Sequence, residues 1–161
     1  MLNPSKIGDA SVEDIQPLIR SSGYFRQKAE RIRIFSRFLM DRYDGSMASM
    51  LSGDFSAIRG ELLSLKGIGN ETADSIMLYA GNIPTFVVDA YTFRMAERTG
   101  IYKGQDYNHL KRLFESSIEP DFRIYNEFHA LIVELGKRHC KKKPSCAGCP
   151  ISSICAYHKK L

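Results

Sequence analysis

The sequence predicts an all-α protein built from two lobes. Apolar residues recur at three- and four-residue intervals along nearly the whole chain, as in amphipathic helices, and the two-residue alternation of strands is almost absent. Glycine and proline interrupt this pattern at residues 81–84. We therefore expect a helical lobe at residues 1–84 and a second lobe at residues 85–161.

Each expected helix has its own apolar stripe or cap. Ser11 and Asp14 have the spacing of a capping box at the start of a short helix. Gly23 precedes a long amphipathic helix, and a glycine-rich turn separates the next two helices. An apolar stretch at 85–88 then leads into three further helices. The expected helices are residues 12–19, 25–43, 55–65, 70–80, 90–99, 107–118 and 123–138.

The composition excludes several classes of protein. Hydrophobic residues make up 43% of the chain, charged residues 25%, and the mean hydropathy is −0.25, which is ordinary for a globular protein. No apolar run approaches the roughly 18 residues that a membrane span needs. The N-terminal residues lack the basic and apolar regions of a secretory signal. We expect a soluble, cytoplasmic protein that has no membrane partner.

Positive charge is concentrated at the C-terminal end. The net charge is +5, yet residues 137–161 contain seven lysines or arginines and no acidic residue. The other 136 residues carry 16 basic and 18 acidic side chains. A local basic patch favours a polyanion such as nucleic acid, although a solvated basic tail has the same composition.

All four cysteines lie in this basic segment, with the spacing C-x5-C-x2-C-x5-C. Four thiolates so close in sequence can surround one metal centre. The spacing favours a [4Fe–4S] cluster, which is larger than a single ion and tolerates wider intervals. Zinc sites usually have two short cysteine pairs, and only the middle pair is short here; zinc, disulfides and free thiols remain alternatives. The cysteines are Cys140, Cys146, Cys149 and Cys155.

A glycine-rich turn between two expected helices is the first specific motif. Gly67 and Gly69 flank Ile68, which we expect to pack between the helices. Lys66 precedes the turn, and the next helix starts at Asn70. The backbone N–H groups of such a turn and helix N-terminus point outward and can bind a phosphate, with the lysine beside it. A plain helix–turn–helix connection is the alternative.

Four motifs and a single arginine resemble the endonuclease III superfamily of helix–hairpin–helix DNA glycosylases. The segment LKGIGNETADSIMLYA resembles the helix–hairpin–helix, and PTFVVD, which ends at Asp89, resembles the segment of the catalytic aspartate. Arg94 matches a family arginine, and GYFRQKA at 23–29 resembles a helix start. The cysteines resemble the family's iron–sulfur loop, with a first interval one residue shorter than usual. The family pattern has further helices before the segment that matches Val12, so an N-terminally shortened fold is expected.

Two positions point to one branch of this family. Glu71 stands two residues after the second glycine of the hairpin, where bifunctional members have the lysine that forms a Schiff base. Ala90 and Tyr91 follow Asp89 where endonuclease III has Thr-His. Both features resemble the 3-methyladenine glycosylase III type, although the mismatch-specific branches also lack the lysine.

The resemblance implies a monofunctional base-excision repair glycosylase that acts on alkylated purines. Its implied cofactor is a [4Fe–4S] cluster, and its implied partner is double-stranded DNA with a damaged base, bound by a nucleoid-associated monomer. Asp89 would stabilise the positive charge on the sugar of a flipped nucleotide, and Glu71 would add negative potential. A helix N-cap and a solvated glutamate are the simpler interpretations. The implied DNA-binding residues are Lys66, Gly67, Ile68, Gly69, Lys141, Lys142 and Lys143.

Alternatives to this function are a mismatch-specific or oxidised-base glycosylase and a non-catalytic DNA-binding fragment. We expect His109 and His129 to be surface or satisfied histidines, because neither has a metal-ligand partner one helical turn away. The aromatic residues of the later helices are expected to pack. They are Tyr91, Phe93, Tyr125 and Phe128.

Overall fold

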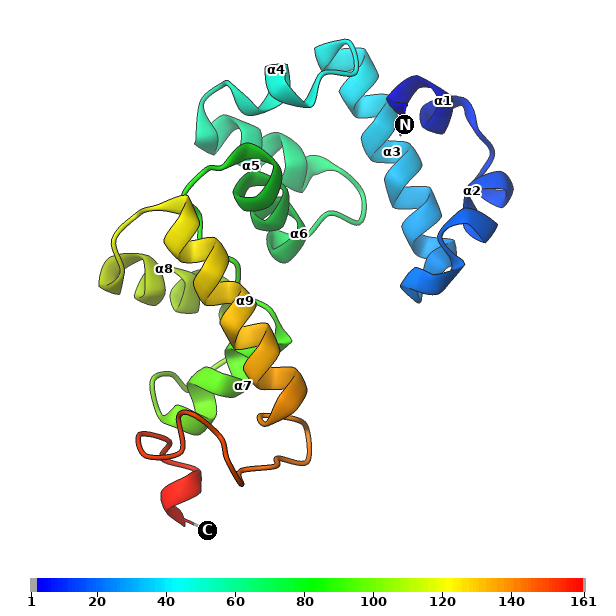
Figure 1. Ribbon diagram of the computed structural model, residues 1–161. Helices are drawn as coiled ribbons and strands as arrows, with labels where there is room; N and C mark the ends of the chain where they lie inside the picture. Colours follow the sequence, from blue (N-terminus) through cyan, green and yellow to red (C-terminus); the bar gives the residue numbers. More distant parts are fainter. Residues whose placement is uncertain (1–2, 161) are drawn as a thin grey trace. The chain divides into compact units, whose positions relative to one another are not determined.

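The computed structural model describes residues 3–160, and the regular structure in this range is helical throughout (Figure 1). The chain forms two compact units, Met1–Ala73 and Asp74–Leu161. The lobe boundary expected after residue 84 stays a prediction. Within residues 3–160, no helix is both long enough and apolar enough to cross a membrane.

The first unit is organised around one long helix. Two short helices, α1 and α2, pack against this helix, α3, and Arg37 of α3 donates a hydrogen bond from Nε to the carbonyl oxygen of Gly8, 2.8 Å away. Asn3, Ser11 and Asp54 cap helices with their side-chain oxygens, as expected for these residue types. The elements are α1 (Pro4–Asp9), α2 (Val12–Leu18), η1 (Arg20–Ser22), α3 (Phe25–Tyr43), α4 (Met47–Leu51) and α5 (Phe55–Ser64).

The predicted helix at 70–80 is present, but it changes from an α-helix to a π-helix part-way along. Helix α6 (Asn70–Ser75) continues into η2 (Ile76–Ala80), which is a π-helix. Short π-helical turns are rare, because they widen the backbone hydrogen-bond ring, and they often occur at functional sites. The wider turn here carries Tyr79, which takes part in the candidate site described below.

The second unit packs three helices around a buried, non-helical segment. These helices are α7 (Ala90–Thr99), α8 (Tyr107–Ser117) and α9 (Phe122–Arg138), and η3 (His158–Lys160) lies near the C-terminus. The apolar stretch 85–88 passes through the core, where Phe86 stacks on Phe114 with ring centroids 4.5 Å apart. This packing explains why an apolar run without helical periodicity directly precedes Asp89.

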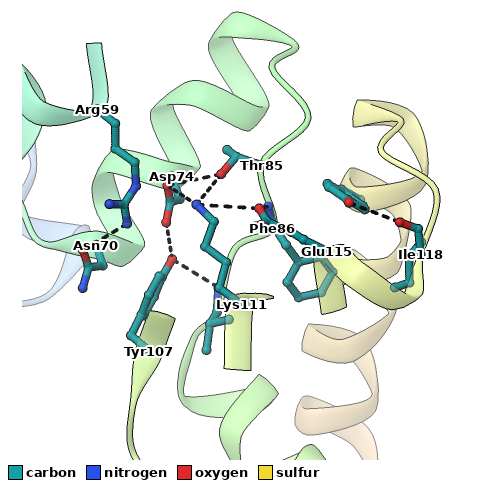
Figure 2. Close-up of polar contacts among 11 residues, drawn as sticks. Arg59, Asn70, Asp74, Thr85, Phe86, Tyr107, Lys111, Glu115 and Ile118 are labelled. Atoms are coloured by element: carbon teal, nitrogen blue, oxygen red, sulfur yellow. Dashed lines mark hydrogen bonds and ion pairs between the residues drawn. The ribbon is translucent and has the colours of Figure 1, made fainter. Parts of the chain in front are cut away.

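A buried polar network fixes the same segment (Figure 2). Lys111 Nζ forms an ion pair with Asp74 Oδ1 at 2.9 Å, and the Tyr107 hydroxyl donates to Asp74 Oδ2 at 2.8 Å. Glu115 accepts a hydrogen bond from the backbone N–H of Phe86 at 2.9 Å. A non-helical segment can be buried only when its backbone groups have such partners. The network therefore holds the chain that leads to Asp89.

Candidate functional site

Asp89 caps helix α7, and its two carboxylate oxygens have different surroundings. Oδ1 accepts hydrogen bonds from the backbone N–H of Thr92 at 2.7 Å and from its hydroxyl at 2.9 Å. The Thr92 hydroxyl oxygen in turn accepts from the backbone N–H of Asp89 at 3.3 Å, which completes a reciprocal cap. Oδ2 lies 3.7 Å from His129 Nε2. The helix cap therefore uses Oδ1 and leaves Oδ2 outside the cap.

The surroundings of Asp89 keep its carboxyl group ionised. Burial raises the pKa of Asp89, but His129 and the hydrogen bonds from Thr92 outweigh burial and hold that pKa below its ordinary value. The ionised carboxylate thus stabilises the fold at neutral pH, and this stabilisation is lost as the pH falls through the lowered pKa. The side chain is 13% exposed, so the negative charge is sheltered but reachable.

The structure corrects the expectation that His129 is a surface or satisfied histidine. His129 is only 8% exposed, and its Nε2 is the one buried side-chain nitrogen or oxygen without a hydrogen-bond partner in the described part of the chain. Its Nδ1 contacts the hydroxyl of Tyr79 on η2. Asp89, His129 and Tyr79 therefore come together from three elements, α7, α9 and η2.

The hairpin between α5 and α6 has the geometry that its glycines predict. Gly67 has a φ of +88°, which other residues rarely adopt, and Ile68 is buried. A Cβ built on Gly69 meets no atom within 4 Å, so the backbone there is open to solvent. Lys66 is exposed and forms an ion pair with Glu30 at 2.9 Å. The lysine is thus placed at the turn and is paired with an acidic side chain of α3.

Glu71 lies in the first turn of α6 and is exposed. It belongs to the first unit, whereas Asp89 belongs to the second. A joint role for the two carboxylates stays a prediction.

The four cysteines line one pocket in the second unit, together with Arg98 of α7. No disulfide joins these cysteines, and the guanidinium of Arg98 donates a hydrogen bond to Cys140 Sγ at 3.3 Å. Within residues 3–160, no three His, Cys, Asp or Glu side chains converge closely enough to hold a single metal ion. Four cysteine side chains around one pocket are the donor set of an iron–sulfur cluster, so the residues present fit such a group.

Helix α7 holds the loop that follows the first cysteine. Arg94 Nε donates to the carbonyl oxygen of Cys140 at 2.6 Å. Arg98 donates to the carbonyl oxygens of Lys141 and Lys142 at 2.7 and 3.0 Å. The backbone of the loop is therefore fixed, while its lysine side chains, with that of Lys143, are exposed. A surface hollow lies beside the start of α7 and is lined by Ala90, Tyr91, Arg94, Gly136, Lys137, Lys141 and Lys142.

A family model described as "HhH-GPD superfamily base excision DNA repair protein" matches residues 1–120. The chain belongs to this superfamily. Among similar HhH-GPD proteins, one from Methanocaldococcus jannaschii that is described as a DNA repair glycosylase is 41% identical, over 96% of this chain and 71% of the relative. Endonuclease III of Thermotoga maritima is 30% identical, over 98% of this chain and 70% of the relative.

Solved structures show the same HhH-GPD fold. A non-covalent endonuclease III–DNA complex matches with a TM-score of 0.80 and 26% identity, over 99% of this chain and 71% of that one. The H. pylori 3-methyladenine DNA glycosylase bound to 1,N6-ethenoadenine matches with a TM-score of 0.74 and 28% identity, over 84% of this chain and 67% of that one. These similarities confirm the predicted all-helical glycosylase fold and the base-excision repair family.

Sequence reasoning missed two residues at the site of this HhH-GPD protein, His129 and Tyr79. A signal for His129 was present, because it lies between the buried Tyr125 and Ile132 at helical spacing. A polar side chain on an apolar helix face requires a partner. Tyr79 gave no comparable signal, since its place depends on the π-helical turn of η2.

Proposed function

We propose that this chain is a monofunctional DNA N-glycosylase that removes alkylated purines from double-stranded DNA. The observation that carries the proposal is the ionised Asp89, whose Oδ2 is not used by the cap of α7. Glu71 supports the monofunctional part, because it stands where the resemblance places the Schiff-base lysine of bifunctional glycosylases.

Asp89 can assist the breaking of an N-glycosidic bond through its charge. The target nucleotide must first leave the base stack. As the bond between C1′ and the base breaks, positive charge develops on the sugar, and the carboxylate of Asp89 stabilises it. Oδ2 then accepts a proton from the water that adds to C1′. A purine alkylated on a ring nitrogen is already cationic and leaves as a neutral base, so this reaction needs no separate general acid.

The similarity to the 3-methyladenine DNA glycosylase, whose structure was solved with an ethenoadenine bound, favours modified purines over other bases as the substrate. A second candidate is a glycosylase for oxidised or mismatched bases, which the endonuclease III relatives favour. Glu71 speaks against the bifunctional oxidised-base glycosylases, which have a lysine there, but not against the mismatch-specific branches, which also lack it. A lysine there permits strand cleavage through an imine, and a glutamate does not.

Two surfaces of the chain are proposed to bind the DNA backbone. The hairpin offers the open backbone at Gly69 and the neighbouring Lys66, each suited to a phosphate. The loop at Lys141–Lys143 offers exposed ammonium groups, and its first two lysines line the hollow beside the start of α7. Phosphate contacts of this kind position a protein on any duplex without reading its sequence.

The cysteine pocket is proposed to hold a [4Fe–4S] cluster. Cys140, Cys146, Cys149 and Cys155 would be its four ligands, which leaves no iron for a substrate. When bound, the cluster would tie the loop together and so order the lysines that it contains. Arg98 supports this role, because hydrogen bonds to cluster sulfurs are a common feature of such sites.

Excision from a panel of duplexes tests the proposal, with alkylated, ethenoadenine-containing, oxidised and mismatched substrates. The variant Asp89→Asn is informative because asparagine caps helices as well as aspartate, so the fold should be retained. We expect excision of alkylated purines to fall about 100-fold or more, with binding of damaged DNA nearly unchanged. Equal rates for the variant and the wild type would remove Asp89 from the mechanism.

The reaction product tests the monofunctional assignment. We expect an intact strand with an abasic site that breaks only in alkali or heat, and no covalent adduct after borohydride treatment. Lys66 is an amine near the hairpin, so Lys66→Ala is the matched control. A borohydride adduct that persists in this variant would show lyase chemistry from another amine, and the second candidate would then be favoured.

A further inference from the structure

His129 differs from an ordinary buried histidine in the hydrogen bonding of its ring nitrogens. It lies on α9, it is more than nine-tenths buried, and only one of its ring nitrogens has a hydrogen-bond partner among the described residues. Buried polar atoms are normally paired, because leaving one unpaired is costly. The unpaired nitrogen, Nε2, faces Asp89 Oδ2 at 3.7 Å.

The two neighbours of the His129 ring, Tyr79 and Asp89, together indicate where the imidazole proton lies. The pKa of Tyr79 is raised, mainly by burial and also by the negative charge of Asp89, so its hydroxyl remains protonated. Because the Asp89 carboxylate can only accept hydrogen bonds, we expect Nε2 to face it with the imidazole proton, which leaves Nδ1 to accept from the Tyr79 hydroxyl. A neutral imidazole that accepts at Nδ1 carries its proton on Nε2. That proton is then directed toward Asp89.

The carboxylate of Asp89 is consequently held from two sides. Thr92 of α7 contacts Oδ1 through two hydrogen bonds. His129 of α9 faces Oδ2 with Nε2 at 3.7 Å, which is longer than a hydrogen bond, so the N–H dipole of the imidazole attracts the carboxylate at short range. Helix α7 and η2 pack against α9 and present Asp89 and Tyr79 to the imidazole, while α8 contributes the apolar ring of Phe114 beside Phe128.

We infer that His129 is a positioning residue for Asp89, with its imidazole oriented by Tyr79 and its Nε2 proton holding Oδ2 in place at the start of α7. The inference deepens the proposed function and rests on it, because it assigns a task to His129 only if Asp89 acts in base excision. The contact itself does not depend on that activity, so it can be tested separately.

The contact is tested by NMR of the imidazole nitrogens in the DNA-free protein. We expect His129 to be the Nε2–H tautomer in the wild type. Its signal is assigned by its loss in His129→Gln. In Tyr79→Phe, a smaller share of His129 should be in this tautomer. We also expect the pKa of Asp89 to rise in His129→Leu, because His129 is one of the groups that lower it. The control His109→Gln changes an exposed histidine of α8 and should leave both readings unaltered. An Nδ1–H tautomer in the wild type would overturn the inference.

The consequence is tested by single-turnover excision. We expect His129→Leu to slow excision about 10- to 100-fold while binding of damaged DNA stays nearly constant. As the pH is lowered, His129→Leu should lose activity at a higher pH than the wild type does. The reason is that the raised pKa makes Asp89 easier to protonate. His129→Gln keeps an N–H donor and should recover part of the rate. Equal rates for His129→Leu, His129→Gln and the wild type would contradict the inference.

The two proposals can fail separately. A wild-type protein that excises no base from any duplex contradicts the proposed function. The tautomer of His129 and the pKa of Asp89 then still decide whether the imidazole holds the carboxylate.

Discussion

The carboxylate of Asp89 shows how one residue can both start a helix and take part in a reaction. An N-cap contributes about 1 kcal/mol, and at Asp89 it uses only Oδ1. The cap also restricts the side-chain torsions, so holding Oδ2 beside His129 costs little further conformational entropy. The simple N-cap and the catalytic interpretation of this residue are therefore compatible.

The two hairpin glycines are expected to respond differently to alanine. Gly67→Ala forces a side chain into a backbone with φ +88° and against Arg31, so we expect a loss of stability of about 1–2 kcal/mol.

Gly69→Ala has open space around the new Cβ and should keep the wild-type melting temperature. It should nevertheless weaken binding to an undamaged duplex, because the methyl group separates a phosphate from the backbone amides. Thermal unfolding and fluorescence anisotropy measure the two effects, and wild-type affinity in Gly69→Ala would show that the hairpin does not touch the DNA backbone.

At the scale of elements, helix α7 connects the carboxylate to the cysteine loop. Asp89 lies at its start, and Arg94 and Arg98 bind carbonyl oxygens of the loop from its later turns. Helix α9 lies close to α7 because Gly136 has no side chain, and a Cβ there would clash with the Tyr91 ring. The loop and the candidate catalytic residue therefore share one rigid support.

The cysteine loop gives a prediction about metal content. Protein purified without oxygen should contain about four irons per chain and absorb broadly near about 400 nm. Cys146→Ser removes one of the four expected ligands and should lower the iron content and destabilise the loop. Ser152→Ala changes a neighbouring residue of the same pocket and should retain the iron. One zinc and no iron per chain, by elemental analysis, would contradict the cluster.

The sequence predicted the elements whose pattern spans several turns. The helices at 25–43, 70–80, 90–99 and 107–118 lie where apolar periodicity placed them. Helices α1 and α4 were missed, because six and five residues are too few to show a helical period. The π-helical turn of η2 also gave no signal, since its residues have an ordinary helical pattern.

At the scale of the whole molecule, motifs that are local in sequence could be predicted, and contacts between distant segments could not. The hairpin, Asp89 and the cysteines were each recognisable from a short run of residues. The contact between Tyr79 and His129 joins residues fifty positions apart. It depends on how η2 and α9 pack, which a single sequence does not specify. His129 was misinterpreted for this reason.

The charge distribution of the whole chain leads to a prediction about salt. The net positive charge comes from the C-terminal segment, and its loop at 141–143 holds three exposed lysines on a fixed backbone. Each phosphate contact releases condensed counterions, so the logarithm of affinity falls with the logarithm of salt concentration in proportion to the number of contacts.

Changing Lys141, Lys142 and Lys143 to glutamine should weaken binding to any duplex and reduce the slope of log affinity against log salt by up to about three. The control changes Lys6 and Lys103, two exposed lysines outside this segment, to glutamine and should leave the slope unchanged. If the triple variant binds with the wild-type slope in a salt titration, the loop is a solubilising surface and the hairpin alone contacts the DNA backbone.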